Sequence, residues 1–287
     1  MNQRTAVVTG AGSGFGRLTA QTLARTGWRV YATLRDPAGR NAAAAGELRS
    51  AGIAVVELDV TSDASVDAAA GTILDAAGSV DLLVNNAGTG FFGIVEAYTP
   101  AAVERQFATN VIGPLRVNRA FLPSMRARRA GLVVYVSSVV GRLVIPFEAI
   151  YGASKFALEV LAEASSYELA PFGVDVAIVE PGAYPTDIVT GLVEADDKER
   201  IAAYGPVAKH AEQVASGLQH LSKGRDPQEV ADAIVRLANL PAGERPLRTV
   251  VPGNPGVDAI NAALAPIQRE TLKRMGLEAL LPKAAAK

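Results

Sequence analysis

Tyr151 and Lys155 stand four residues apart in the stretch Tyr-Gly-Ala-Ser-Lys. If this stretch is helical, their side chains lie one above the other on the same face of the helix. A tyrosine hydroxyl is a poor acid or base at neutral pH because its reference pKa is near ~10, but a nearby positive charge lowers that pKa. The pair could therefore move a proton to or from a substrate. Such pairs also occur by chance, so the interpretation needs a cofactor site and a substrate-orienting group elsewhere.

The composition is typical of a globular protein, since the 287 residues are 49% hydrophobic and 20% charged. No linker or composition break divides the chain, so we expect a single domain over residues 1–287. A net charge of −1 provides no basic surface for nucleic acid or a membrane. The chain has no cysteine, and two histidines are too few for a usual zinc site, so no metal is expected. No signal peptide is evident, and we expect a cytoplasmic protein.

A glycine-rich turn follows the first predicted strand. Residues 5–9 are apolar and β-branched, residues 10–16 read Gly-Ala-Gly-Ser-Gly-Phe-Gly, and a helical pattern begins directly afterwards. Glycines let the backbone approach a pyrophosphate, and a helix N-terminus offers free N–H groups to it. The alternative is a turn that binds nothing. The strand before and the helix after favour the phosphate site.

Arg35 directly follows the second predicted strand, residues 29–34. An NAD-binding fold would normally place an acidic residue near this point, against the ribose 2′-hydroxyl. An arginine can instead hold a 2′-phosphate through charge-assisted hydrogen bonds, which favours NADP(H) over NAD(H). Two alternatives are that Arg35 pairs with the neighbouring Asp36, or that it is an ordinary solvated charge.

Five further strands are predicted, over residues 53–58, 81–84, 131–136, 174–179 and 247–251, with helical patterns between most of them. This alternation predicts an α/β, Rossmann-type doubly wound parallel sheet with helices on both faces. Polar or glycine-containing motifs follow most of the strands directly, and the carboxyl ends of parallel strands form the ligand-binding edge of such a sheet. The motifs are the glycine turn, Arg35, Asp59, Asn85-Asn86, Ser137-Ser138 and Pro181-Gly182.

Two segments lie outside this alternation. From residue 187 to 223 the pattern is irregular, with no predicted strand, which indicates a lid or substrate loop over about 187–225. A helical tail is predicted over about 255–287. Asn110 falls inside a long helical pattern, residues 100–129, where an asparagine is more often solvent-facing than functional.

The ordered set of motifs resembles the classical short-chain dehydrogenase/reductase family, over residues 5 to about 190. A looser resemblance links residues 30–36 and the long tail to the branch of 17β-hydroxysteroid and retinol dehydrogenases. The matching pieces are Thr9-Gly10-x3-Gly14-x-Gly16, Asp59, Asn85-Asn86-Ala87-Gly88, Asn110, Ser138 with Tyr151-x3-Lys155, and Pro181-Gly182 with Thr186.

The resemblance implies four catalytic residues. Tyr151 would donate a proton to a carbonyl oxygen during reduction and accept one during oxidation. Lys155 would lower the pKa of Tyr151 and bind the nicotinamide ribose. Ser138, selected over Ser137 by its spacing to the tyrosine, would orient the substrate oxygen. Asn110 would hold a water that connects Lys155 to solvent.

The resemblance also implies the cofactor contacts. Gly10, Ser13 and the backbone of Phe15 and Gly16 would bind the phosphates. Arg35 would bind the 2′-phosphate, Asp59 and Val60 the adenine, and Asn86 the adenosine ribose. The backbone near Tyr184 and the Thr186 hydroxyl would hold the carboxamide. Tyr184 is bulkier than the aliphatic residue usual there, so it could narrow the pocket or reach the substrate.

We therefore expect an NADP(H)-dependent enzyme, with NAD(H) possible, that interconverts a ketone and an alcohol. The candidate pocket walls are apolar, with no evident carboxylate to clamp a substrate: Phe91, Phe92, Val144, Phe147, Tyr184, Ile188 and Leu192. Alternatives are an NAD-dependent alcohol dehydrogenase of the steroid or retinol type, a non-catalytic NADP(H) sensor, and epimerisation or dehydration on the same fold. By family resemblance we expect a homodimer or homotetramer that pairs through the two long helices beginning near Pro100 and Ile150.

Overall fold

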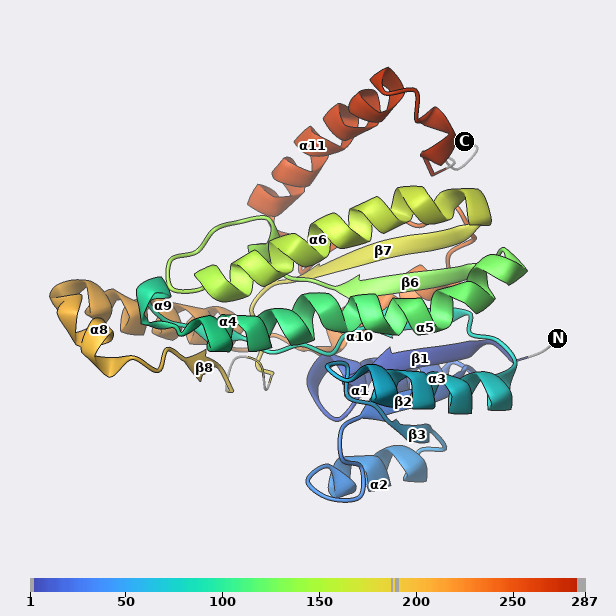
Figure 1. Cartoon of the computed structure of the whole chain (residues 1–287), viewed down its shortest axis with the longest axis horizontal. Helices are drawn as coiled ribbons and strands as arrows, with labels where there is room; N and C mark the ends of the chain where they lie inside the picture. The colour runs from blue at the N-terminus through green and yellow to red at the C-terminus, as the bar shows by residue number, and fades with distance from the viewer. Residues whose placement is uncertain (1–2, 187, 189–190, 283–287) are drawn as a thin grey trace.

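A seven-stranded parallel sheet forms the centre of the protein, in a computed structural model that describes residues 3–186, 188 and 191–282 (Figure 1). Its strand order is β3-β2-β1-β4-β6-β7-β9. Each predicted strand is found, with its ends shifted by at most two residues. The strands are β1 (Thr5–Thr9), β2 (Arg29–Leu34), β3 (Ala54–Glu57), β4 (Leu82–Asn85), β6 (Gly131–Val136), β7 (Val174–Pro181) and β9 (Arg248–Val251).

Helices cover both faces of this sheet, which confirms the doubly wound α/β class. Successive side chains of a strand point to opposite faces. In β1, Ala6 and Val8 pack into one core and Val7 into the other. The first face is covered by α1 (Gly14–Arg25), α2 (Ala42–Ser50) and α10 (Gln228–Asn239). The second is covered by α3 (Asp63–Ala77), α5 (Gly113–Arg128) and α6 (Ala149–Leu169).

The long helix predicted over residues 100–129 is interrupted. It consists of α4 (Pro100–Phe107), a π-helical segment (Ala108–Ile112) and α5. Pro114 has no N–H to donate to the carbonyl of Asn110, and this missing hydrogen bond lies beside the interruption. The side chain of Asn110 is 1% exposed, so the expectation that it faces solvent is wrong. Single π-turns inside helices are frequent at functional sites.

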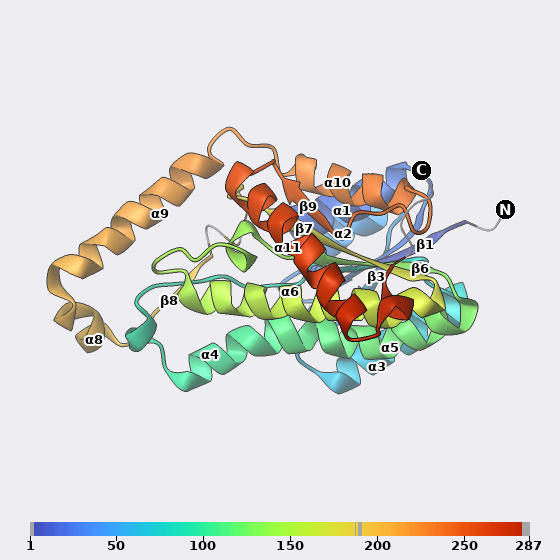
Figure 2. The ribbon, with the colours of Figure 1, turned by 90° about the horizontal axis from the view of Figure 1, so that it is seen from above.

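The segment after β7 contains one short strand, contrary to the sequence prediction. β8 (Val193–Glu194) pairs with β5 (Phe91–Phe92), about a hundred residues earlier in the chain. Hydrophobic periodicity cannot detect a strand of two residues. Two helices follow, α8 (Lys198–Ala203) and α9 (Ala208–Ser222), and both extend away from the sheet (Figures 1 and 2).

The chain ends with α11 (Pro255–Arg274), which crosses over α6 in Figure 2 and confirms a helix in the tail. No helix among the described residues is both long and apolar enough to cross a membrane.

Candidate active site

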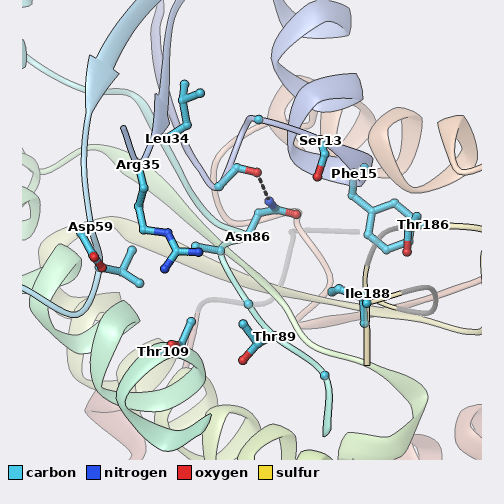
Figure 3. Close-up of a pocket in the computed structure, with 18 of the residues that line it drawn as sticks. Ser13, Phe15, Leu34, Arg35, Asp59, Asn86, Thr89, Thr109, Thr186 and Ile188 are labelled. Atoms are coloured by element: carbon cyan, nitrogen blue, oxygen red, sulfur yellow. Dashed lines mark hydrogen bonds between the residues drawn. The ribbon is translucent and has the colours of Figure 1, made fainter. Parts of the chain in front are cut away.

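A cleft of about 490 Å³ opens at the carboxyl ends of β1, β2, β3 and β4. The chain runs from β1 outward to β2 and β3 and then returns to β4 on the other side of β1. The loops after β1 and β4 therefore diverge, and ligands bind at such a point in doubly wound sheets. Figure 3 shows Arg35 and Asp59 on one side of this cleft and Ser13, Phe15 and Thr186 on the other.

Glycine is required at two positions of the loop after β1. Gly10 has φ +65°, and a Cβ there would lie 2.8 Å from the Cα of Ala87. A Cβ on Gly16 would lie 2.5 Å from the carbonyl oxygen of Gly10 and 2.4 Å from Nδ2 of Asn86. The exposed Ser13 makes no capping hydrogen bond to α1, and the first turn of α1 has no acidic residue. This helix terminus suits the phosphates of a dinucleotide.

Side chains from β1 and β4 hold the two loops together. The Thr9 hydroxyl donates to the carbonyl of Val84 and accepts from the N–H groups of Asn86 and Ala87. Nδ2 of Asn86 donates to the carbonyls of Thr9 (2.9 Å) and Gly10 (3.2 Å), and the dashed line in Figure 3 marks its bond to the glycine loop. The amide of Asn86 thus shapes the wall of the cleft.

Arg35 and Asp59 line the far end of the cleft. Asp36 accepts from the N–H groups of Gly39 and Arg40, so its two carboxylate oxygens serve its own turn and are not paired with Arg35. Asp59 accepts from the N–H and hydroxyl of Thr61. Burial raises the pKa of Asp59, but these hydrogen bonds and the charges of Arg35 and Arg40 outweigh it, and the net pKa is lowered.

The structure brings Ser138, Tyr151 and Lys155 together in a second, smaller pocket of about 100 Å³. Ser138 follows β6, and the other two lie in the first turns of α6. This pocket shares Phe15, Asn86, Thr186 and Ile188 with the cleft, so the two cavities adjoin. The neighbouring Ser137 also lines it, but its hydroxyl is buried without a hydrogen-bond partner among the described residues.

Burial controls the ionisation of Tyr151 and Lys155. Burial raises the pKa of Tyr151, a hydrogen bond with Ser138 acts to lower it, and the carboxylate of Glu148 raises it further. The net direction is upward, so the lowered pKa expected from the sequence is wrong for the protein alone. Burial lowers the pKa of Lys155 to about 8, although Glu159 acts to raise it. Nζ of Lys155 donates to the carbonyl of Val136 at 2.9 Å and lies 5.6 Å from the centroid of the Tyr151 ring.

Asn110 bridges the loop after β4 and the helix that carries Tyr151. Its Oδ1 accepts from the N–H of Thr89, and its Nδ2 donates to the carbonyl of Thr89 and to the hydroxyl of Ser154. A Cβ on Gly88 would meet both Asn110 Oδ1 (3.4 Å) and Lys155 Nζ (3.8 Å). Asn110 and Lys155 therefore border the same small space.

Tyr184 lies in the wall of the smaller pocket. Its ring is 1% exposed and packs edge-on against Phe15, with 5.5 Å between centroids. Its hydroxyl donates to Oε2 of Glu229 at 2.7 Å. The ring forms part of the pocket wall. Thr186, also buried, contributes to both cavities.

Only some of the expected walls line the smaller pocket: Phe91, Tyr184, Ile188 and Leu192 do so. Val144 is 80% exposed, and Phe92 packs against Phe147 outside this pocket. One wall residue was missed altogether, the buried carboxylate of Glu148, so the expectation of a pocket without a carboxylate is wrong. The available signal was its place in an otherwise apolar stretch, three residues before Tyr151.

Comparisons with known proteins agree with this geometry. Residues 4–197 match the family model described as short chain dehydrogenase. Retinol dehydrogenase 8 of Homo sapiens is 37% identical over 243 residues, covering 82% of this chain and 77% of that protein. A short-chain dehydrogenase from Streptomyces avermitilis has a TM-score of 0.76 at 32% identity, covering 95% of this chain and 96% of its own.

A second solved structure, an actinorhodin polyketide ketoreductase with NADPH, has a TM-score of 0.69 at 27% identity and covers 90% of this chain and 92% of its own. The match to the family model covers more than half of the chain. The chain therefore belongs to the short-chain dehydrogenase family, and it is an oxidoreductase that acts on CH–OH groups with a nicotinamide cofactor.

Proposed function

We propose that this protein is an NADP(H)-dependent oxidoreductase that interconverts a carbonyl and an alcohol on an apolar substrate, with Tyr151 as the proton donor and acceptor. The observation that carries the proposal is the shared wall between the cleft and the pocket of Ser138, Tyr151 and Lys155. A substrate in that pocket would lie against a nicotinamide ring in the cleft. The cofactor, when bound, supplies or accepts the hydride.

The residues of the chain would handle the substrate oxygen and its proton. The Ser138 hydroxyl would donate a hydrogen bond to that oxygen and fix its angle. Tyr151 would protonate it during reduction, and general acid catalysis of this kind contributes about 10²–10⁴-fold. Holding the substrate carbonyl and the cofactor in a reactive orientation contributes a further large part of the rate enhancement. Lys155 and Asn110 would return a proton to Tyr151 through the space beside Gly88.

The direction of the pKa shift on Tyr151 suits its role as the proton donor in reduction. The raised pKa of Tyr151 keeps the phenol protonated at neutral pH, and a protonated phenol is the form that donates to a carbonyl. Oxidation needs the phenolate. Lys155 could stabilise the phenolate because, with its pKa at about 8, the ammonium form predominates at pH 7.

The preference for NADP(H) rests on Arg35. Arg35 lines the cleft beyond the end of β2. The carboxylate of Asp36 accepts hydrogen bonds from the N–H groups of Gly39 and Arg40. An arginine can bind a 2′-phosphate in a bidentate manner. The NADPH in the neighbouring ketoreductase structure supports the same cofactor.

A second candidate is an NAD-dependent alcohol dehydrogenase of the steroid or retinol type, and the similarity to retinol dehydrogenase 8 supports the kind of alcohol in that candidate. A non-catalytic NADP(H) sensor needs neither Tyr151 nor Lys155, and both line the pocket here.

A panel of apolar ketones and alcohols, assayed with both cofactors, distinguishes these functions. We expect turnover with NADPH that Tyr151→Phe reduces by at least about a hundredfold, because the variant cannot donate a proton. Cofactor affinity, measured by calorimetry, should be unchanged. Near-normal turnover by Tyr151→Phe would exclude the mechanism. Tight NADPH binding with no turnover of any substrate by the wild type would favour the sensor.

We further propose a homodimer or homotetramer that pairs through α5 and α6, which both cover the second face of the sheet. Apolar side chains on and next to these helices are exposed, and Val160 is the most exposed of them at 68%. Clustered exposed apolar groups mark interaction surfaces. The others are Ile112, Leu115, Phe156 and Leu161.

A further inference from the structure

Glu148 is a buried carboxylate in the wall of the pocket that holds Ser138, Tyr151 and Lys155. The residue is 7% exposed, and its Oε1 has no hydrogen-bond partner among the described residues. Burial raises its pKa to about 7. Most buried polar side chains in proteins are hydrogen-bonded, so an unpaired carboxylate oxygen that lines a cavity requires an explanation.

The backbone holds Glu148 in a defined position. Phe147, directly before it, has φ +69°, a conformation that is costly for a bulky residue. The carbonyl of Phe147 accepts from the N–H of Gly93 at 2.7 Å. The N–H of Glu148 donates to the carbonyl of Ile145, and its carbonyl accepts from the N–H of Gly152. The carboxylate is therefore built on a fixed turn at the start of α6.

Lys155, the cation in the lining of the same pocket, does not pair with Glu148. Nζ of Lys155 donates to the carbonyl of Val136, and the carboxylate that acts on its pKa is Glu159. An apolar residue would fill the site of Glu148 without the desolvation cost of a buried charge. A carboxylate in this position is explained if its partner arrives with the substrate.

We propose that Glu148 accepts a hydrogen bond from a hydroxyl or ammonium group that the substrate carries close to its reacting carbonyl. This inference rests on the proposed function. It narrows the substrate class from an apolar ketone to an apolar ketone with a second, hydrogen-bond-donating group. Glu148 is then a specificity-determining residue.

The position of Glu148 relative to Tyr151 sets the position of that second group. Residues three apart at the start of a helix are neighbours, with about 5–6 Å between their Cβ atoms. The charge of Glu148 acts on the pKa of Tyr151, as expected for two groups that face one pocket. A substrate oxygen held by Tyr151 would therefore place a group a few bonds away within reach of Glu148.

A matched series of probes tests this inference: 2-decanone and its 1-hydroxy, 4-hydroxy and 1-amino derivatives. The ratio of kcat/KM for each derivative to that for 2-decanone is measured with NADPH. In the wild type we expect this ratio to be at least about ten for one or more derivatives. A preference of this size corresponds to the free energy of one hydrogen bond to a charged group. In Glu148→Leu the ratio should fall to near one. The control Glu57→Leu, on the edge strand β3, should keep the wild-type ratio.

Glu148→Gln keeps the shape of the side chain and separates the two kinds of donor. A neutral amide oxygen still accepts from both donors but carries no charge to pair with an ammonium, so the ratio for the hydroxyketones should partly survive, whereas the ratio for the aminoketone should fall much further. Calorimetry also measures the Kd of each derivative and of 2-decanone in Tyr151→Phe with bound NADPH, with and without Glu148→Gln. The ratio of the two Kd values is then compared between these variants. This binding readout does not depend on turnover.

Equal ratios in the wild type and Glu148→Leu would overturn the inference, as would a wild type with no preference for any derivative in either kcat/KM or Kd. If 2-decanone is reduced and Tyr151→Phe abolishes that activity, the proposed function stands even when the inference fails. If no probe is reduced but the Kd ratios depend on Glu148, the proposed function fails and the inference about binding stands.

Discussion

At the scale of single residues, burial decides what the ionisable groups of the pocket can do. The same apolar surroundings raise the pKa values of Tyr151 and Glu148 and lower that of Lys155. Each shift disfavours the charged form of its group. Arg35 differs, because it is exposed at the edge of the cleft and can pair with a phosphate that is still partly hydrated.

Arg35→Ala should therefore weaken NADPH binding far more than NADH binding. A hydrogen bond to a charged group contributes about 1.5–3 kcal/mol, which corresponds to a rise of about 10–100-fold in the KM for NADPH. Steady-state kinetics with both cofactors measures this effect. The control Arg49→Ala removes an exposed arginine from α2 and should change neither KM. An equal rise in both KM values would show that Arg35 does not bind the 2′-phosphate.

At the scale of elements, close approach of backbones builds the cleft. The loop after β1 touches the loop after β4 at Gly10, and α1 begins so close to both that Gly16 has no room for a side chain. The π-helical turn performs a related task, because it directs Asn110 inward to bridge Thr89 and Ser154.

Gly16→Ala should disrupt the cofactor site by pushing the loops apart, since the new Cβ would lie 2.4 Å from Asn86 Nδ2 and 2.5 Å from Gly10 O. We expect NADPH affinity to fall by at least about tenfold. The backbone N–H groups of the glycine loop can hydrogen-bond the phosphates only while this loop stays in contact with the loop after β4. The matched control is Gly46→Ala inside α2, where a Cβ would meet nothing within 4 Å. That change should stabilise the fold by about 0.5–1 kcal/mol. Calorimetry and thermal unfolding measure both effects, and unchanged NADPH affinity in Gly16→Ala would contradict this view of the loop.

At the scale of the whole molecule, the surface formed by α5 and α6 presents apolar side chains to solvent in the single chain. If this surface pairs with a second copy, a charge at its most exposed apolar position should prevent assembly, because a buried unpaired charge is costly. Val160→Asp should therefore be monomeric by light scattering after size exclusion, whereas the wild type is a dimer or tetramer. Val207→Asp, at an exposed valine between α8 and α9, should assemble like the wild type. A monomeric wild type would refute the proposed interface.

Much of the fold and most of the candidate site could be predicted from the sequence because both depend on local order along the chain. Each strand is an apolar run that ends at a polar or glycine-containing motif, so the parallel arrangement alone places Arg35, Asp59, Asn86 and Ser138 at one edge. The i, i+4 spacing of Tyr151 and Lys155 needed only a helix, and α6 provides it.

The features that could not be predicted depend on contacts between distant segments. The strand pair of β5 and β8 joins residues about a hundred positions apart. The inward side chain of Asn110 depends on a π-turn beside Pro114, and the hydroxyl of Tyr184 is bound by Glu229 from α10.

The sequence by itself determined the succession of strands and helices along the chain, the glycine loop, and the residue types for proton transfer. Hydrophobic periodicity and motif spacing depend only on residues that are close in the chain. Only the tertiary structure decided the ionisation of these groups and the existence of a carboxylate in the pocket wall. The pKa of a group and the pairing of a buried oxygen depend on how many atoms from other elements surround it. Glu148 shows this difference most directly: in the sequence it is one polar residue in an apolar stretch, and in the fold it lines the same pocket as Tyr151 and acts on the pKa of that tyrosine.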